Sequence, residues 1–267
     1  MTGKSGPFDI REAAEIIRGI TGDRLVLVGG QAVNYWAERF RAEDPGLEPL
    51  APFTSADIDF LGRAEAVESI ARRFHGKARF ADWDHQNTPE IAVVEGTYNG
   101  KPLRIDFLGS VIGPSNVDIR QSALKVTEQT SGTSFLALHP LHLLECRLGN
   151  VAGPLKRHDE QSLRQLKAAI RVTANYIRHR LRDPEGGPRK ALNQIERVFA
   201  LADEDQALFA KARHNIDLIE AIPTDIVPEL PQPFTETRWP QVQQHLARRY
   251  EAYLKATGIV PVDRKHG

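Results

Sequence analysis

Residues 25–30 read LVLVGG, a short apolar run that ends in a glycine pair. Four consecutive apolar residues favour a short buried strand, and the two glycines that follow stop it. Residues 31–41 then place Ala32, Val33 and Trp36 on one face of a helix. The stretch therefore predicts a strand, a tight glycine turn and a helix in direct succession.

A second strand is predicted over residues 57–61, which read DIDFL. Side chains two positions apart on a strand point to the same face, so Asp57 and Asp59 project together. Ile58 and Phe60 then point into the core. Taken alone, such a pair of acids is also typical of a solvated strand end.

A third carboxylate follows on a predicted β-hairpin. Residues 91–97 and 103–108 are rich in apolar side chains and flank the turn Tyr-Asn-Gly-Lys at 98–101. Asn-Gly between two such runs is a strong hairpin signal. The second arm carries Asp106, and its hydrophobic-Asp-hydrophobic pattern repeats that of residues 57–61.

Three carboxylates on half-buried strands favour a divalent cation. Like charges held close together are costly unless a cation neutralises them, and hard oxygen ligands suit Mg²⁺ or Mn²⁺. Backbone N–H groups at a glycine turn that leads into a helix can bind phosphate. The succession of strand, glycine pair, helix, Asp-x-Asp strand and a further strand that carries Asp106 is hard to reach by accident, although Gly29 and Gly30 alone could equally be a plain tight turn.

The rest of the chain divides into a mixed first half and a helical second half. In the first half the patterns predict helices over 9–20 and 63–74, a loop over 42–56 and a strand over 134–138. In the second half they predict a proline-rich linker over 223–233 and helices over 140–151, 159–181, 188–201, 203–222 and 240–257. The expected fold class is α/β (α+β), with a mixed sheet and flanking helices over 1–138 and a helical domain over 139–267.

The order of these motifs resembles the polymerase-beta-like nucleotidyltransferase superfamily, whose pattern is hydrophobic-Gly-[Gly/Ser], a helix, hydrophobic-Asp-hydrophobic-[Asp/Glu] and a later single acid. Within it the chain looks most like the AbiEii-type nucleotidyltransferase toxins and their bacterial relatives. The stretches that carry this likeness are residues 28–30, 54–60, 105–107, 138–144 and 156–159. The resemblance covers roughly residues 24–170 and implies a nucleotidyltransferase fold for the first domain.

The resemblance also implies roles for individual residues. Asp57 and Asp59 would bind two ions, Mg²⁺ or Mn²⁺, and Asp106 would complete the ion next to the attacking hydroxyl. The nucleoside triphosphate would lie in the cleft between the two domains. The residues implied to contact it are Gly29, Gly30, Arg147, Lys156 and Arg157.

The chain departs from the family pattern in two places. Gly30 and Asp57 are separated by 26 residues, so residues 42–53 look like an insertion, which we expect to form a mobile rim of the site. In the helical part, Arg147 stands near the usual lysine, and Ser162 stands near the usual second acid.

The acceptor of the transferred nucleotide stays open among tRNA or another RNA, a protein hydroxyl and a small molecule. A basic row on one predicted helix favours an RNA, a tRNA end first, although such rows are also typical of solvated helix faces. The row consists of Arg164, Lys167, Arg171 and Arg178. The alternative from another class is a catalytically silent module that binds an antitoxin partner in a toxin–antitoxin system.

The composition of the chain indicates which kinds of partner and which cellular compartment to expect. Thirty-five Lys and Arg balance thirty-five Asp and Glu, so no net charge draws the chain to nucleic acid or to a membrane. The single cysteine, Cys146, has apolar helical neighbours and is expected to be an inert buried thiol in a reducing compartment. No apolar stretch approaches the roughly 20 residues of a membrane span, so we expect a cytoplasmic protein with no membrane partner.

Overall fold

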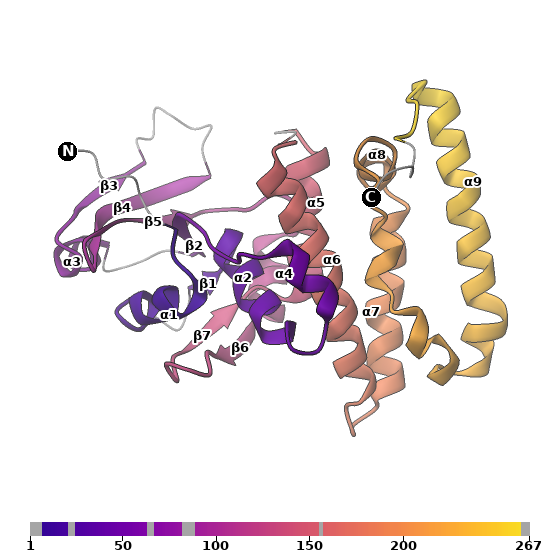
Figure 1. Ribbon diagram of the computed structural model, residues 1–267, viewed down its shortest axis with the longest axis horizontal. Coiled ribbons are helices and arrows are strands. Elements are labelled where there is room, and N and C mark those ends of the chain that lie inside the picture. The colour runs from indigo at the N-terminus through magenta and orange to yellow at the C-terminus, as the bar shows by residue number, and fades with distance from the viewer. Residues whose placement is uncertain (1–6, 21–24, 63–66, 82–88, 155–156, 263–267) are drawn as a thin grey trace. The chain divides into compact units, whose positions relative to one another are not determined.

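A seven-stranded mixed sheet lies at the centre of the first half of the protein (Figure 1). The computed structural model describes residues 7–20, 25–62, 67–81, 89–154 and 157–262. The sheet has the strand order β3-β4-β5-β2-β1-β7-β6, with β2–β5 and β1–β7 parallel and the other neighbouring pairs antiparallel. The strands are β1 (Val26–Leu27), β2 (Asp57–Leu61), β3 (Lys77–Phe80), β4 (Glu90–Tyr98), β5 (Lys101–Leu108), β6 (Leu124–Thr127) and β7 (Ser134–Ala137). The predicted mixed α/β fold class is confirmed.

Four helices accompany the sheet: α1 (Ile10–Arg18), α2 (Gly29–Phe40), α3 (Val67–Arg73) and α4 (Asn116–Ser122). Helix α1 begins where the sequence predicts, because the Asp9 side chain accepts hydrogen bonds from the backbone N–H groups of Arg11 and Glu12, each 2.9 Å long. Helix α2 begins two residues earlier than predicted, at Gly29 itself. The glycine pair is therefore the first turn of the helix.

The predicted β4–β5 hairpin is confirmed. Its turn residues Asn99 and Gly100 have φ angles of 50° and 76°, the left-handed conformation that matches the twist of the flanking strands. The hairpin fixes the register of β5, which in turn lies parallel to β2.

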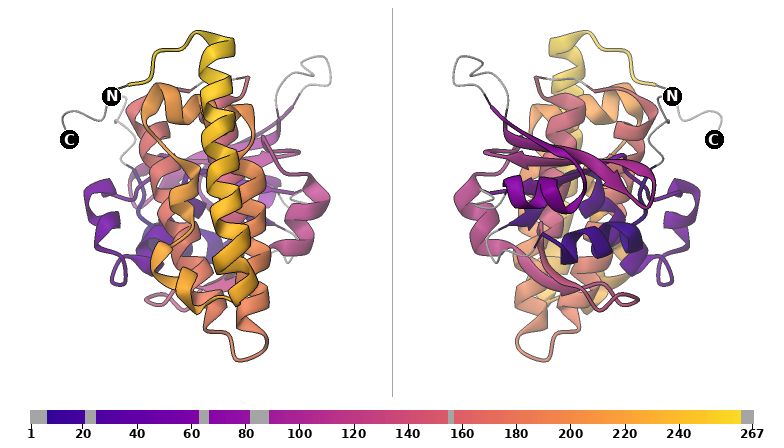
Figure 2. Two further views of the ribbon diagram at one scale, coloured as in Figure 1. Left: turned by 90° about the vertical axis from the view of Figure 1, so that its right-hand side faces the viewer. Right: turned by 90° about the vertical axis from the view of Figure 1, so that its left-hand side faces the viewer.

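The second half consists of α5 (Pro140–Ala152), α6 (Glu160–Leu181), α7 (Gly187–Ala202), α8 (Asp205–His214) and α9 (Trp239–Thr257). The axes of α6, α7 and α9 are nearly parallel to one another in the views of Figures 1 and 2, and the chain reverses its direction between α6 and α7. The prediction of one helix over 203–222 is wrong, because Asn215 takes a φ of 51° and ends α8. The expected linker over 223–233 is not a plain connection either, since it contains the short helix η3 (Thr224–Glu229) and buries Ile226 and Leu230. The short helix η2 (Leu218–Ala221) precedes this segment, and η4 (Phe234–Arg238) follows it.

The chain forms two compact units. Unit 1 contains the described residues of Met1–Ala42 and Ala51–Leu143, and unit 2 contains those of Glu43–Leu50 and Leu144–Gly267. Residues 43–50 thus pack with the helical unit, as the short helix η1 (Pro45–Leu50).

The expectation of a mobile rim over 42–53 is therefore wrong. Leu47 in η1 is fully buried, and only 7% of the surface of Asp44 is exposed. Asp44 accepts hydrogen bonds from Arg171 Nη1 at 2.8 Å, from Asn175 Nδ2 at 2.9 Å and from the backbone N–H of Gly46 at 2.9 Å. Three prolines and a glycine suggested a loop, but these contacts make residues 43–50 part of the core of unit 2.

We expect Asp44→Ala to destabilise the protein by about 2 kcal/mol, because Arg171, Asn175 and the backbone N–H of Gly46 lose the carboxylate that accepts their hydrogen bonds. Burial alone would raise the pKa of Asp44, but the donors from Asn175, Gly46 and Arg171 outweigh it and hold the pKa below its usual value. The stability that ionised Asp44 provides is therefore complete above the ordinary aspartate pKa and is lost as the pH falls through the lowered one. Thermal unfolding of both proteins from pH 7 down to about pH 2 checks this, since their difference should shrink only in acid. A difference that does not change with pH would contradict it.

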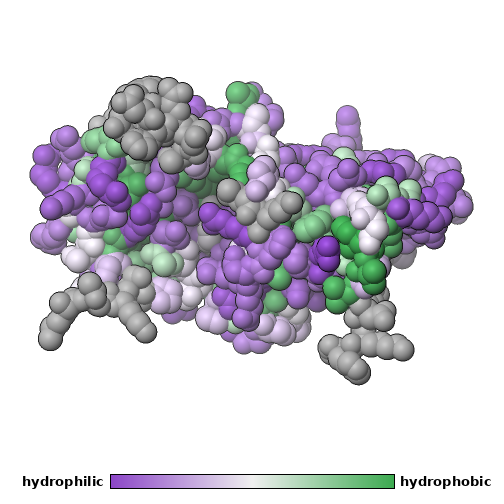
Figure 3. Space-filling model, turned by 90° about the horizontal axis from the view of Figure 1, so that it is seen from above, coloured by the Kyte–Doolittle hydropathy of each residue, from purple (hydrophilic) through white to green (hydrophobic). Residues whose placement is uncertain are grey.

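The surface is mostly hydrophilic on the face drawn in Figure 3, where hydrophobic residues show only in separate areas. The large apolar side chains that are exposed belong to different parts of the chain, namely Phe80, Val117, Val260 and Val262. Within the described ranges, no helix is long and apolar enough to cross a membrane.

Candidate metal centre

Asp57, Asp59 and Asp106 form one cluster, called the acid cluster below. Each offers a carboxylate oxygen, and these oxygens all lie within 4.8 Å of one another. The register explains why: β2 and β5 run side by side in parallel, with Asp59 directly opposite Asp106. Residues opposite each other in neighbouring strands point to the same face, so all three carboxylates project from that face.

Asp106 is the most buried of the three, with 5% of its surface exposed. Burial raises the pKa of Asp106, although the neighbouring Arg104 guanidinium partly offsets the effect. Arg104 Nε donates a hydrogen bond of 3.0 Å to Oδ2 and lies 2.9 Å from Oδ1. Its single N–H serves Oδ2, so Oδ1 has no hydrogen-bond donor among the described residues. A buried carboxylate oxygen without a donor fits a ligand atom for a cation.

Arg104 is a site residue that the sequence analysis missed. It stands two positions before Asp106 on β5, and its side chain therefore lies on the same face of the strand. Its partner across the strands is Asp57. Its Nη2 pairs with Glu90 Oε1 at 3.0 Å. The alternation of side chains along a strand, which predicts the paired acids of β2, also predicts that Arg104 and Asp106 share one face.

Asp57 is held by a chain of hydrogen bonds that begins in helix α2. Gln31, which is fully buried, donates through Nε2 to the backbone oxygens of Phe8 at 3.0 Å and Ser55 at 3.5 Å. Ser55 Oγ donates to Asp57 Oδ1 at 2.8 Å. The start of α2 therefore fixes the segment that orients Asp57.

We expect Ser55→Ala to lower divalent-metal affinity about tenfold, because the hydroxyl that orients Asp57 is lost while the three carboxylates remain. Calorimetric titration with Mn²⁺ measures this effect. Ser122→Ala, which removes a hydroxyl from α4, is the matched control and should bind as the wild type does. Equal affinities for the Ser55 variant and the wild type would mean that Ser55 does not orient a ligand.

The glycine turn and the acid cluster are in contact. Gly29 has a φ of 64°, and a methyl group on its Cα would lie 1.8 Å from Asp59 Oδ2. The backbone N–H of Val28 donates to the Asp59 carbonyl oxygen at 2.9 Å. Gly30 is buried in the first turn of α2. Only glycine fits at position 29 both in backbone conformation and in the space left by Asp59.

Of the remaining predicted contact residues, the two that the structure describes belong to unit 2. Arg147 lies on α5 in unit 2, where its Nη1 donates to Gln165 Oε1 at 2.7 Å. Arg157 is exposed in the same unit. Lys156 lies outside the described residues. Unit 1 alone thus brings together the three aspartates and the two glycines.

The basic row on α6 is partly neutralised. Arg171 pairs with Asp44, and Arg178 forms a two-point ion pair with Asp225, with distances of 3.0 Å from Nε and 2.8 Å from Nη2. Two of the four cations of the predicted row are therefore already paired with carboxylates. Arg164 and Lys167 remain as the cations of that face for which no acidic partner is found among the described residues.

The donor set of the acid cluster defines what it can do chemically. Three carboxylates with one half-exposed arginine beside them suit a hard divalent ion such as Mg²⁺ or Mn²⁺ rather than a soft metal. An ion held there would lie next to the N-terminus of α2, where backbone N–H groups can donate hydrogen bonds to phosphate oxygens. No protein-family model and no curated protein matches the chain.

Proposed function

We propose that this protein is a metal-dependent nucleotidyltransferase, an enzyme that transfers a nucleoside monophosphate from a nucleoside triphosphate to an acceptor hydroxyl. The observation that carries the proposal is the acid cluster, whose three carboxylate oxygens lie within 4.8 Å of one another. The contact between Asp59 and the glycine turn supports the proposal, because the reaction needs a metal site directly beside a phosphate-binding site. We place the activity in the cytoplasm, where the buried thiol of Cys146 stays reduced.

The acid cluster would hold the ions, with Asp57 and Asp59 as shared ligands and Asp106 as the third. Bound Mg²⁺ supplies positive charge that neutralises the triphosphate and lowers the pKa of the acceptor hydroxyl. Arg104 keeps Asp106 oriented through the Nε hydrogen bond. The backbone N–H groups at Gly29 and Gly30 are the donors that the chain offers to phosphate oxygens at the start of α2.

The reaction is a displacement at the α-phosphorus. A bond forms between the acceptor oxygen and the α-phosphorus, while the bond from this phosphorus to the oxygen bridging to the β-phosphate breaks. Pyrophosphate leaves with the bonding electrons, and the acceptor proton passes to solvent. The protein contributes position and electrostatic stabilisation and forms no covalent bond to the nucleotide.

A tRNA or another RNA is our first choice of acceptor, with a protein hydroxyl or a small molecule as the alternatives. Arg164 and Lys167 on α6 are the cations left to meet a phosphate backbone from that helix. A silent module that only binds an antitoxin partner is disfavoured, because a scaffold gains nothing from holding three like charges together.

Transfer of label from nucleoside triphosphates carrying a radioactive α-phosphorus tests the proposal. The protein is incubated with Mg²⁺, each of the four labelled triphosphates and separate pools of total RNA, total protein and small metabolites. Label in one pool that requires Mg²⁺ and is absent with Asp57→Asn supports the proposal and identifies the acceptor class. Absence of label from all pools, or label that persists with Asp57→Asn, would reject it.

A further inference from the structure

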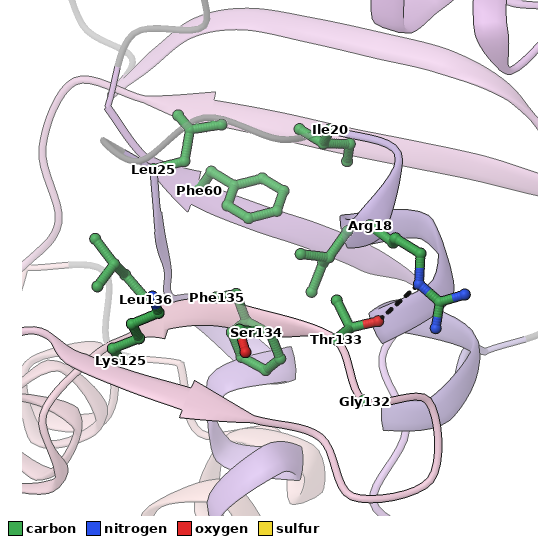
Figure 4. A pocket seen from close by; sticks show the side chains of 11 residues that line it. Arg18, Ile20, Leu25, Phe60, Lys125, Gly132, Thr133, Ser134, Phe135 and Leu136 are labelled. Carbon is green, nitrogen blue, oxygen red and sulfur yellow. Dashed lines mark hydrogen bonds between the residues drawn. The ribbon is translucent and has the colours of Figure 1, made fainter.

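A cavity of about 620 Å³ opens in unit 1 beside the C-terminal end of α1 (Figure 4). No residue of the acid cluster lines it. Its walls are mainly apolar and are made by Ile17, Ile20, Leu25, Phe60, Phe135 and Leu136. In Figure 4 the ring of Phe60 reaches into the space between Ile20 and Leu25 above and β7 below. The volume falls within the roughly 300–1,000 Å³ of small-molecule sites.

The charged side chains among the described residues that line the cavity are both cationic. Arg18 and Lys125 lie at opposite sides of it (Figure 4). None of the described residues that line the cavity is acidic, and Lys125 has no ion pair or hydrogen bond with the described part of the chain. The described lining of the cavity therefore combines an apolar body with two cations and no carboxylate.

Arg18 is held in place by neutral groups. Its Nε donates to Thr133 Oγ1 at 3.1 Å, and its Nη2 donates to the Ser131 carbonyl oxygen at 2.6 Å. A guanidinium group has five N–H donors, so these bonds orient Arg18 and leave further donors for a ligand. The charge itself meets no carboxylate among the described residues.

Thr133 adds a second donor. The residue is 6% exposed, and its Oγ1 accepts from both Arg18 and Ser131 Oγ. Its own O–H finds no acceptor in the described ranges. A nearly buried hydroxyl beside an oriented guanidinium matches the two oxygens of a carboxylate, one for each donor.

We propose that this cavity binds a small anion with an apolar body, such as an aromatic or branched aliphatic carboxylate. The carboxylate pairs with Arg18 and Thr133, and the hydrocarbon part fills the space around Phe60. A cationic ligand is disfavoured by Arg18 and Lys125, and a neutral ligand leaves the donors at Arg18 and Thr133 without a charged acceptor. The proposal does not depend on the nucleotidyltransferase activity, since none of the acid cluster lines the cavity.

Isothermal titration of the full chain with phenylbutyrate and with phenylbutanol tests the charge requirement. The two probes share one hydrocarbon body and differ only in the carboxylate. We expect one saturable site for phenylbutyrate, with an affinity at least about tenfold higher than that of the alcohol. Equal binding of both probes, or no saturable binding of phenylbutyrate up to about 10 mM, would overturn the proposal.

Substitutions then locate the site. Arg18→Gln, and separately Ser134→Glu, which places a carboxylate at the cavity wall, should each weaken phenylbutyrate binding about tenfold and leave phenylbutanol unaffected. Arg11→Gln is the matched control, because Arg11 is an exposed arginine on the same helix and does not line this cavity. Thermal unfolding confirms that each variant is folded. Phenylbutyrate binding that is indifferent to both cavity variants, or equally weakened by Arg11→Gln, would contradict the assignment.

Discussion

Asp59→Asn is expected to lower the rate of nucleotidyl transfer by about 10³-fold, which corresponds to roughly 4 kcal/mol of lost transition-state stabilisation. The substitution keeps the shape of the side chain and removes one charge from the acid cluster. Asp57→Asn and Asp106→Asn should act alike, because the three oxygens lie within 4.8 Å of one another and would bind the same ions. The measurement is the initial rate of label transfer at saturating Mg²⁺.

The control for this prediction is Glu68→Gln, which removes one negative charge from an exposed position on α3. It should leave the rate unchanged, since surface charge outside the cluster binds no ion. A tenfold or smaller loss in all three aspartate variants would show that the acid cluster does not hold the reacting groups.

Gly29→Ala is expected to abolish metal-dependent transfer and to destabilise unit 1 by more than the about 1–2 kcal/mol of a left-handed alanine. The added methyl group would lie 1.8 Å from Asp59 Oδ2 and 2.6 Å from its Cγ, so the whole carboxylate must move. Transfer rate and melting temperature are measured on the same protein.

Gly186→Ala separates backbone strain from displacement of Asp59. Gly186 also has a left-handed φ, 76°, but no atom lies within 4 Å of the position of an added methyl group. This variant should lose stability by strain alone and keep its transfer activity. If Gly29→Ala retains wild-type activity, the contact between the glycine turn and Asp59 has no functional role.

Local pattern was enough to place the three acids on strands, but not to bring them together. Alternation along β2 placed Asp57 and Asp59 on one face, and the Asn-Gly turn located the hairpin that carries Asp106. The parallel pairing that sets Asp59 opposite Asp106 is a long-range contact that periodicity does not encode. In the sequence analysis only the resemblance brought the three acids together.

Other parts of the fold depended on partners far along the chain. Residues 42–53 have no apolar periodicity, yet Asp44 and Leu47 are buried because Asp44 meets Arg171 on a helix 127 residues away. Strand β3 was missed because three of its four side chains are exposed, so no alternation marks it. The end of α8 was missed although Asn215 is a residue type that tolerates the left-handed conformation.

Calorimetric titration of Mn²⁺ into the wild type and into the double variant Asp57→Asn, Asp59→Asn tests whether the acid cluster binds a divalent metal. Both titrations are done with a saturating non-hydrolysable nucleoside triphosphate analogue, and circular dichroism shows that the variant is folded. The proposed acid cluster predicts saturable Mn²⁺ binding in the wild type that is weakened at least about 100-fold in the variant. Equal Mn²⁺ affinities in the two proteins would contradict the assignment of these carboxylates as metal ligands, and with it the proposed reaction.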